Sequence, residues 1–256
     1  MRLRDKVIII TGSTTGIGRA IAERCVAEGA RVLVHGRDRQ HGEEVVARLG
    51  SGAALHLDDL ADPASPARIA AAAMQAFGRI DAVVNNAAIV PRTTITTATV
   101  EAFEYTMAIN VRAPLFLIQA AFPQLKANRG SVLNIGSINA HSGEATFLHY
   151  SISKGALQTL SRNLANAHGA EGVRFNHFNV GWVLTPNEYA KQVSEGQPPD
   201  WPEKVSQFGI PSGRLIAPET IASAAVFWLG DESRPISGSV LELEQFSVYG
   251  RNPVKS

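Results

Sequence analysis

Cysteine, long apolar runs and clusters of like charge are all scarce in this 256-residue sequence. Its single cysteine, Cys25, excludes a disulfide within the chain and favours a reducing, cytoplasmic location. No apolar run approaches the roughly 18 residues of a membrane span. The apolar run near the amino terminus is too short for a signal peptide. We therefore expect neither membrane insertion nor export.

The balance of basic and acidic residues argues against a nucleic-acid-binding protein. The 24 basic residues nearly balance 23 acidic ones, and no run of five like charges occurs. A nucleic-acid-binding protein concentrates basic residues, so a small molecule is the expected partner, with no nucleic acid and no membrane. The histidines lack the paired spacing of zinc proteases and a lone cysteine forms no thiolate cluster, so no metal site is expected.

Short β-rich runs alternate with alanine-rich amphipathic stretches along the sequence. This alternation predicts a doubly wound, Rossmann-like α/β fold with about seven parallel strands, helices on both faces and a single domain spanning residues 1–256. The expected strands are 7–11, 31–36, 54–57, 82–85, 131–135, 174–180 and 239–243. The expected helices are 17–28, 39–49, 64–77, 99–127, 149–169 and 218–229.

One long irregular stretch, residues 185–212, carries five prolines. Long loops in compact domains are commonly functional, and ligands of open α/β sheets bind beyond the carboxyl ends of the strands. Because this stretch directly follows a strand, we predict that it is a substrate lid. Four aromatic residues either line a cleft or form the lid's own small core: Trp182, Tyr189, Trp201 and Phe208.

A glycine-rich turn follows the first expected strand and precedes a helix, with Gly12, Gly16 and Gly18 at the junction. Glycines there permit a tight turn and close approach of the backbone to a diphosphate, while the helix amino terminus favours negative charge. This setting favours dinucleotide binding over a purely structural turn or a different nucleotide.

The second expected strand ends at Gly36 and is followed by Arg37, where an NAD-selective protein would carry an acid for the ribose hydroxyls. A guanidinium at this edge would pair with the 2′-phosphate of NADP. NADP is therefore the favoured cofactor and NAD the alternative. In a competing interpretation, Arg37 is a solvated residue at a helix start that Asp38 neutralises.

Tyr150 and Lys154 are four residues apart, so they share one face of the expected helix 149–169. A neighbouring ammonium favours the phenolate and would lower the pKa of Tyr150 towards the working range. Tyr150 is then a plausible general acid or base. An isolated tyrosine and lysine with this spacing are usually two helix residues without a catalytic role. The pair becomes evidence for catalysis only together with the motifs around it.

Together these motifs resemble the short-chain dehydrogenase/reductase family. The resemblance rests on TGSTTGIG at 11–18, NNAA at 85–88, Asn110, Ser137 and the pair Tyr150 and Lys154, and it covers essentially the whole sequence. It implies hydride transfer between C4 of a nicotinamide and a carbonyl or alcohol carbon.

The resemblance also implies roles for individual residues. Ser137 would hold the substrate oxygen, and Tyr150 would exchange its proton. Lys154 would bind the nicotinamide ribose and lower the pKa of Tyr150, while Asn110 would anchor a water relay. The residues implied at the cofactor, with Asp59 at the adenine and Thr185 at the carboxamide, are Gly12, Ser13, Thr15, Gly16, Ile17, Gly18, Arg37, Asp59, Leu60, Asn86, Ala87, Tyr150, Lys154, Val183 and Thr185.

The sequence departs from the family pattern in three places. Val180-Gly181-Trp182 replaces the usual proline–glycine pair, which leaves the backbone beside the nicotinamide less rigidly set. Ala88 replaces a glycine, and Glu244-Gln245-Phe246 replaces Asp-Gly-Gly after the last strand. These changes put the substrate class in doubt rather than the catalysis.

Polar residues near the expected reaction centre favour a small sugar or polyol over a steroid or acyl chain. The residues expected at the substrate are Ser137, Asn139, Glu144, Tyr150 and Trp182, with Asn187, His141 and His149 as further candidates. Each histidine is interpreted first as a surface or packing residue. An apolar ligand would leave such groups unpaired, at about 1 to 3 kcal/mol each. Alternatively these side chains point to solvent, and Trp182, Ile89 and Val90 line the pocket.

The sequence therefore predicts an NADP-preferring oxidoreductase acting on a secondary alcohol or ketone. A homotetramer, or else a dimer, is expected, because helices 99–127 and 149–169 resemble those that pair across subunits in the family. The alternative is a noncatalytic dinucleotide-binding regulator of the same fold, against which the intact catalytic set argues. A sugar-nucleotide epimerase of the extended branch would need more than the 71 residues that follow Thr185.

Overall fold

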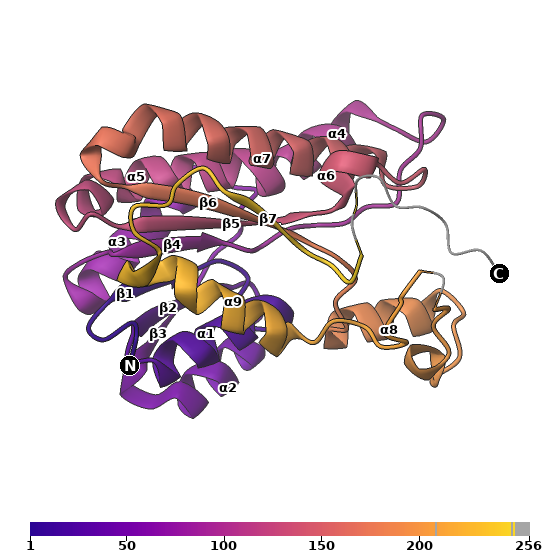
Figure 1. Cartoon of the computed structure of the whole chain (residues 1–256), viewed down its shortest axis with the longest axis horizontal. Coiled ribbons are helices and arrows are strands. Elements are labelled where there is room, and N and C mark those ends of the chain that lie inside the picture. Colours follow the sequence, from indigo (N-terminus) through magenta and orange to yellow (C-terminus); the bar gives the residue numbers. More distant parts are fainter. Residues whose placement is uncertain (208, 247, 249–256) are drawn as a thin grey trace.

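A computed structural model describes residues 1–207, 209–246 and 248, and it confirms the predicted doubly wound fold (Figure 1). Seven parallel strands form one sheet in the order β3-β2-β1-β4-β5-β6-β7. The strands are β1 (Val7–Ile10), β2 (Arg31–Gly36), β3 (Ala53–Leu57), β4 (Ala82–Asn85), β5 (Ser131–Ser137), β6 (Arg174–Val180) and β7 (Val240–Leu243). The order reverses between β1 and β4, where open α/β sheets bind their ligands.

Helices cover both faces of the sheet. One face carries α1 (Gly16–Ala27), α2 (Arg39–Leu49) and α9 (Pro218–Leu229). The other carries α3 (Ser65–Phe77), α5 (Ala113–Ala127) and α7 (Leu148–His168). The shorter helices α4 (Val100–Met107), α6 (Asn139–Ser142) and α8 (Pro186–Ser194) lie towards the carboxyl ends of the strands (Figure 1). Within the described ranges, no helix is long and apolar enough to cross a membrane.

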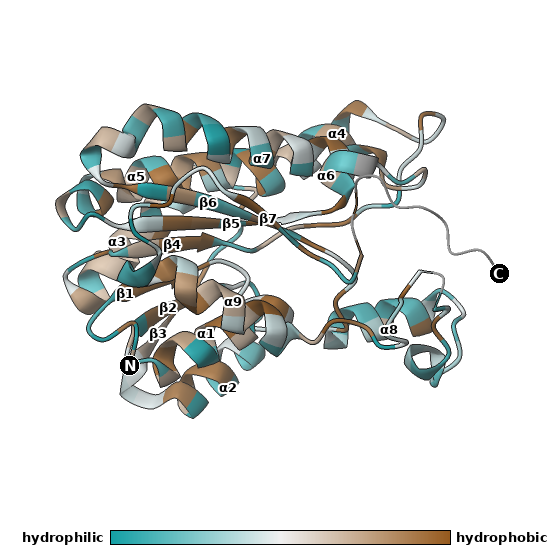
Figure 2. Cartoon of the chain, in the orientation of Figure 1, coloured by the Kyte–Doolittle hydropathy of each residue, from teal (hydrophilic) through white to brown (hydrophobic). Residues whose placement is uncertain are grey.

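Successive residues of β1 enter different cores, which explains its uninterrupted apolar run. Ile8 and Ile10 of β1 join the core under α1 and α9, whereas Ile9 joins the core under α3 and α5. All three side chains are fully buried. A strand buried on both faces needs no polar alternation. Strand β4 is mostly brown in Figure 2, whereas β6, with the sequence RFNHFNV, carries teal segments, as does the region around α8.

The helix predicted over 99–127 is interrupted. A π-helical segment, Ala108–Arg112, separates α4 from α5. The amide of Ala113 donates to the carbonyl of Ala108, a bond to the fifth residue back that widens the turn. The π-helical turn occurs together with contacts between Asn110 and segments distant in sequence. A local pattern of apolar residues does not contain that information, so it cannot predict the turn.

The lid predicted as irregular, residues 185–212, contains regular structure. Helix α8 covers Pro186–Ser194, and a short 3-10 turn covers Trp201–Glu203. Two local signals start the helix and were missed: the Thr185 hydroxyl accepts from the Glu188 amide, and proline occupies the first turn. The predicted lid residue Phe208 lies outside the described residues.

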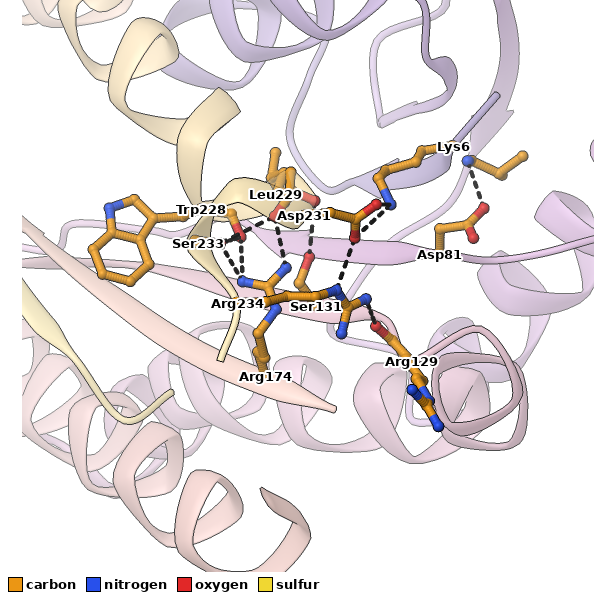
Figure 3. Close-up of polar contacts among 12 residues, drawn as sticks. Lys6, Asp81, Arg129, Ser131, Arg174, Trp228, Leu229, Asp231, Ser233 and Arg234 are labelled. Carbon is orange, nitrogen blue, oxygen red and sulfur yellow. Dashed lines mark hydrogen bonds and ion pairs between the residues drawn. The ribbon is translucent and has the colours of Figure 1, made fainter. Parts of the chain in front are cut away.

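At the amino-terminal ends of the strands, a buried arginine, Arg174, joins β6 to α9 (Figure 3). Arg174 is 3% exposed, and its guanidinium donates to the carbonyls of Trp228 and Gly230 at 3.0 Å each. Positive charge stabilises the carboxyl end of a helix, where carbonyls lack intrahelical partners. Burial lowers the pKa of Arg174 to about 10, which keeps it charged at neutral pH. Arg174 therefore has a structural role.

Candidate active site

A cleft of about 720 Å³ opens at the carboxyl ends of the strands. Its walls come from the glycine-rich turn after β1, the end of β2, the loops after β3 and β4, part of α7 and the first turns of α8. Most residues predicted at the cofactor line this cleft: Gly12, Thr15, Gly16, Ile17, Arg37, Asp59, Leu60, Asn86, Ala87, Tyr150, Lys154 and Thr185. The fold thus gathers segments that are distant in sequence around one cavity.

The glycine-rich turn permits close approach of the chain. Gly12 has a φ of +62°, and a side chain there would meet the Cα of Ala87 at 2.9 Å. The Asn86 side-chain amide donates to the Gly12 carbonyl at 3.0 Å and fixes the turn to the loop after β4. Helix α1 begins at Gly16 on the cleft wall, so the positive end of its dipole suits a diphosphate.

Three residues predicted at the cofactor do not line the cleft. The Ser13 hydroxyl instead accepts from the His35 amide at 3.0 Å and so joins the turn to β2. At Gly18 a side chain would meet the Gly12 carbonyl oxygen at 2.3 Å, so this glycine serves helix packing. Val183 is buried in the core beside α9. Motif spacing does not separate packing residues of this kind from ligand contacts.

Arg37 presents its charge to the cleft at the end of β2. Its side chain is 64% exposed, and its ion pair with Asp59 is long, at 4.0 Å. Asp38 caps α2 instead, accepting from the His41 amide at 2.9 Å. Within the described residues, no ion pair joins Asp38 to Arg37. These contacts disfavour the interpretation in which Asp38 neutralises the guanidinium.

Ser137, Tyr150 and Lys154 come together on one side of the site. Ser137 ends β5, and the other two lie one turn apart on α7. The Ser137 and Tyr150 side chains share a hydrogen bond. The Lys154 ammonium lies 5.5 Å from the Tyr150 ring centre and donates to the Ile135 carbonyl at 2.8 Å.

Burial governs the titration of this pair. It raises the pKa of Tyr150 to about 12, and the hydrogen bond with Ser137 opposes this effect. The negative charge of Glu188 raises the same pKa further. Burial also lowers the pKa of Lys154 to about 8. The predicted lowering of the Tyr150 pKa by Lys154 is therefore wrong for this structure, because desolvation of the phenol dominates.

Asn110 lies in the π-helical segment, where its side chain positions two walls of the site. Its Oδ1 accepts from the Ile89 amide, and its Nδ2 donates to the Ile89 carbonyl, both at 2.9 Å. Nδ2 also donates to the Ser153 hydroxyl on α7 at 3.0 Å. Because these contacts occupy the side chain, the predicted water relay would have to use the Asn110 backbone.

Buried polar contacts that the sequence interpretation missed hold α7 against the sheet. Asn134 of β5 donates to the Ser161 hydroxyl at 2.8 Å, and Asn179 of β6 donates to Gln158 at 2.6 Å. Gln158 and Ser161 lie one and two turns beyond Lys154 on the same helix. Satisfied polar networks rigidify a core, so these contacts fix the helix that carries Tyr150 and Lys154.

Four residues predicted at the substrate do not line the cleft: Ser137, Asn139, Glu144 and Trp182. The Asn139 amide donates to the Ser137 hydroxyl, and Glu144 is exposed. Trp182 stacks on Trp201 with ring centres 5.4 Å apart, so that face is not open to a sugar ring. Trp182 and Trp201 thus pack on each other and do not line the cleft, which favours the second of the two interpretations for these two residues.

The histidine candidates also contact protein groups. His149 is buried with its ring edge-on to Phe103, at 5.5 Å between ring centres. His141 lies 2.7 Å from the side-chain nitrogen of Asn179. Neither histidine lines the cleft, whereas Asn187 does.

The departure at Val180, in place of the proline, is accompanied by contacts from the departure at Glu244. A side chain at Gly181 would lie 1.7 Å from the Glu244 carboxylate. That carboxylate accepts from the Trp182 amide at 3.3 Å and from the Gln245 amide at 2.7 Å. Hydrogen bonds from the end of β7 thus hold the turn that a proline holds in the family pattern.

Two charged residues of α8, Glu188 and Lys191, line the cleft and were not assigned from the sequence. Glu188 follows Thr185 at the spacing of a helix capping box, which is a signal for a helix start and none for a ligand.

The chain matches a family model described as Enoyl-(Acyl carrier protein) reductase over residues 12–244. It is 32% identical over 251 residues to the L-rhamnose 1-dehydrogenase (NAD(P)(+)) of Azotobacter vinelandii, with 94% of this chain and 96% of that protein covered. It is also 32% identical to the D-threitol dehydrogenase of Mycolicibacterium smegmatis, with 95% and 93% covered. A solved structure described as a short chain dehydrogenase/reductase family protein is 35% identical, with a TM-score of 0.84 and 95% and 97% covered.

A doubly wound sheet whose glycine-rich turn shares one cleft with a tyrosine–lysine pair defines a dinucleotide-dependent oxidoreductase. The chain belongs to the short-chain dehydrogenase/reductase family, which confirms the resemblance found in the sequence.

Proposed function

We propose that the protein transfers a hydride between NADP and a secondary alcohol or ketone, with NAD as the alternative cofactor. The observation that carries the proposal is that Tyr150 and Lys154 line a cleft that also contains the glycine-rich turn and Arg37, with Ser137 beside Tyr150. A noncatalytic dinucleotide-binding regulator would need the turn but not the catalytic group, so the enzyme is favoured.

The residues of the chain fit a dinucleotide. The open cleft wall at Gly12 and Gly16 suits the diphosphate, and Arg37 would pair with the 2′-phosphate. Asp59 and Leu60 would contact the adenine, and Thr185 the carboxamide. The name of the Azotobacter vinelandii relative includes both cofactors, which supports the assignment.

The chain handles the proton, while the bound nicotinamide supplies or accepts the hydride. In carbonyl reduction, the Tyr150 hydroxyl donates its proton to the substrate oxygen; in alcohol oxidation, its phenolate accepts that proton. The Ser137 hydroxyl, which shares a hydrogen bond with Tyr150, would also donate a hydrogen bond to the substrate oxygen. Lys154, whose pKa burial lowers to about 8, is mostly charged at neutral pH and keeps donors for a ribose hydroxyl.

A sugar or polyol is the proposed substrate. The names of two relatives specify L-rhamnose and D-threitol. The α8 side of the cleft carries three polar residues, Asn187, Glu188 and Lys191. An apolar ligand would leave such groups without hydrogen-bond partners, at about 1 to 3 kcal/mol each.

A direct absorbance assay of the cofactor tests the proposed function. Purified protein is incubated with NADP or NAD and a panel of sugars, polyols and simple alcohols, and reduced nicotinamide is followed. We expect turnover of at least one polyhydroxylated alcohol, faster with NADP. Absence of turnover across this panel, together with absence of reduction of the matching carbonyls by reduced cofactor, would favour the noncatalytic regulator.

We propose that residues 185–212 close over bound ligands as a lid. Two contacts join this segment to different walls of the cleft: Asn187 donates to the Thr15 hydroxyl at 3.2 Å, and Arg92 donates to Glu195 at 2.9 Å. We expect NADP to slow amide exchange in α8 about tenfold or more while α9 is unchanged. Equal exchange in α8 with and without cofactor would argue against a lid.

We propose a homotetramer, with a dimer as the alternative. Large apolar side chains on α4, α5 and α7 are each more than a third exposed: Phe103, Tyr105, Leu115, Phe116 and Ile152. Exposed apolar residues on neighbouring helices favour burial against another copy. Sedimentation at micromolar concentration should give about four times the chain mass of 27.3 kDa. A species of one chain mass would contradict any such assembly.

We propose a cytoplasmic location. The support is Cys25, a free thiol that is fully buried and whose pKa burial raises to about 12. Such a thiol is not a disulfide partner. Recovery of the protein in a periplasmic or extracellular fraction would overturn this assignment.

A further inference from the structure

Glu188 lies in the first turn of α8, on the wall of the cleft. Its backbone amide donates to the Thr185 hydroxyl at 3.1 Å, which is half of a capping box. The second half is missing, because the Thr185 amide donates to the Val183 carbonyl and not to the Glu188 carboxylate. Helix capping therefore leaves the Glu188 side chain available for another task.

Two donors fix the direction of that carboxylate. The Trp182 indole and the Gln192 side-chain amide each donate to Oε1 of Glu188 at 2.9 Å. Trp182 is itself held by its stacking on Trp201, which is 5% exposed. Both hydrogen bonds fall on Oε1, so Oε2 keeps its lone pairs for a donor from a ligand.

Glu188 forms no ion pair within the described residues. Arg92 is near enough for an electrostatic interaction with Glu188, but other contacts hold its side chain and that of Lys191, one turn further along α8. Arg92 forms an ion pair with Glu195, and the Lys191 ammonium lies over the Phe147 ring at 5.4 Å. Glu188 is also near enough to Tyr150 for its charge to act on the phenol. A fixed, unpaired carboxylate therefore lies on the same cleft as the catalytic tyrosine.

We propose that Glu188 is a specificity-determining residue that accepts a hydrogen bond from a second hydroxyl of the substrate, next to the hydroxyl that is oxidised. The substrates are then vicinal diols, polyols or sugars. A carboxylate only accepts hydrogen bonds, so it rewards a ligand with a donor and penalises one that buries it without a donor. The inference rests on the proposed alcohol oxidation at Tyr150.

Two alcohols that differ by one hydroxyl test this inference: 2,3-butanediol and 2-butanol, each oxidised with NADP. In the unmodified protein kcat/KM should be higher for the diol by about 10- to 100-fold, the range for a hydrogen bond to a charged group. Glu188→Gln should remove most of that ratio, because any change in the pKa of Tyr150 on loss of the Glu188 charge affects both alcohols equally and cancels in the ratio. Glu188→Asp keeps the charge with a shorter reach and should retain part of the ratio.

Glu203→Gln provides the matched control, because Glu203 is an exposed glutamate of the same lid segment outside the cleft lining. It should leave the ratio unchanged. If Glu188→Gln lowers activity on both alcohols equally, or mainly raises the KM for NADP, the inference is overturned and the proposed function stands. If the unmodified protein oxidises neither alcohol with NADP or NAD, the inference falls, and the wider panel then decides the proposed function.

Discussion

Tyr150→Phe is expected to lower kcat by about 10²- to 10⁴-fold, the range for loss of a general acid or base. The substitution removes the hydroxyl that shares a hydrogen bond with Ser137 and leaves the ring under the Lys154 ammonium. Cofactor affinity should therefore change little. Steady-state kinetics with saturating NADP, together with a fluorescence titration of reduced cofactor, separate the two effects.

The pH dependence of the reaction rate should follow the titration of Tyr150. Burial raises the pKa of Tyr150 to about 12, so its protonated form predominates at neutral pH. Carbonyl reduction needs that proton and should vary little with pH up to about 7, where Lys154, whose pKa is about 8, also stays charged. Alcohol oxidation needs the phenolate, whose fraction rises about tenfold for each unit of pH below the pKa. Oxidation should accordingly accelerate with rising pH in the unmodified protein and lose this dependence in Tyr150→Phe.

Tyr105→Phe is the matched control for this experiment. Tyr105 lies on α4, is 43% exposed and does not line the cleft. Removal of the Tyr105 hydroxyl should leave kcat unchanged for both carbonyl reduction and alcohol oxidation. Near-normal turnover by Tyr150→Phe would mean that a different group exchanges the proton, and the mechanism would be wrong.

Arg37→Asp is expected to shift the ratio of kcat/KM for NADP to that for NAD by about 100-fold or more towards NAD. Loss of charge-assisted hydrogen bonds to the 2′-phosphate accounts for about one order of magnitude or more. Repulsion between the new carboxylate and the phosphate adds to the loss, while the carboxylate can accept from ribose hydroxyls. The 64% exposure of Arg37 leaves room for the shorter side chain without disturbing the core.

Arg39→Asp gives the control for a general change of charge at this edge. Arg39 starts α2, is 74% exposed, pairs with Glu43 and does not line the cleft. An acidic residue is also acceptable in the first turn of a helix. The ratio of the two cofactors should stay within about twofold of the unmodified protein. An equal shift in both variants would show that bulk charge, and not recognition by Arg37, sets the preference.

Local patterns explain which parts of the fold were predictable. The strand at Val7–Ile10 is an unbroken apolar run because both of its faces are buried, and that pattern is visible without any partner. The π-helical segment at Ala108–Arg112 was missed because Asn110 bonds to Ile89 and Ser153, residues far along the chain. Helix α8 was missed for a different reason: its cap at Thr185 is local, but the surrounding prolines obscured it.

The sequence by itself determined the alternation of strands and helices, the glycine-rich turn and the spacing of Tyr150 from Lys154, because these depend on backbone preferences and on neighbours within one or two turns. Only the tertiary structure decided which polar groups face the cleft. It packed Trp182 against Trp201, and it placed Glu188 on the cleft wall but not Asn139 or Glu144, which the sequence analysis had assigned to the substrate. It also decided that burial raises the pKa of Tyr150, since desolvation depends on every segment packed around a group and not on its neighbours in the chain.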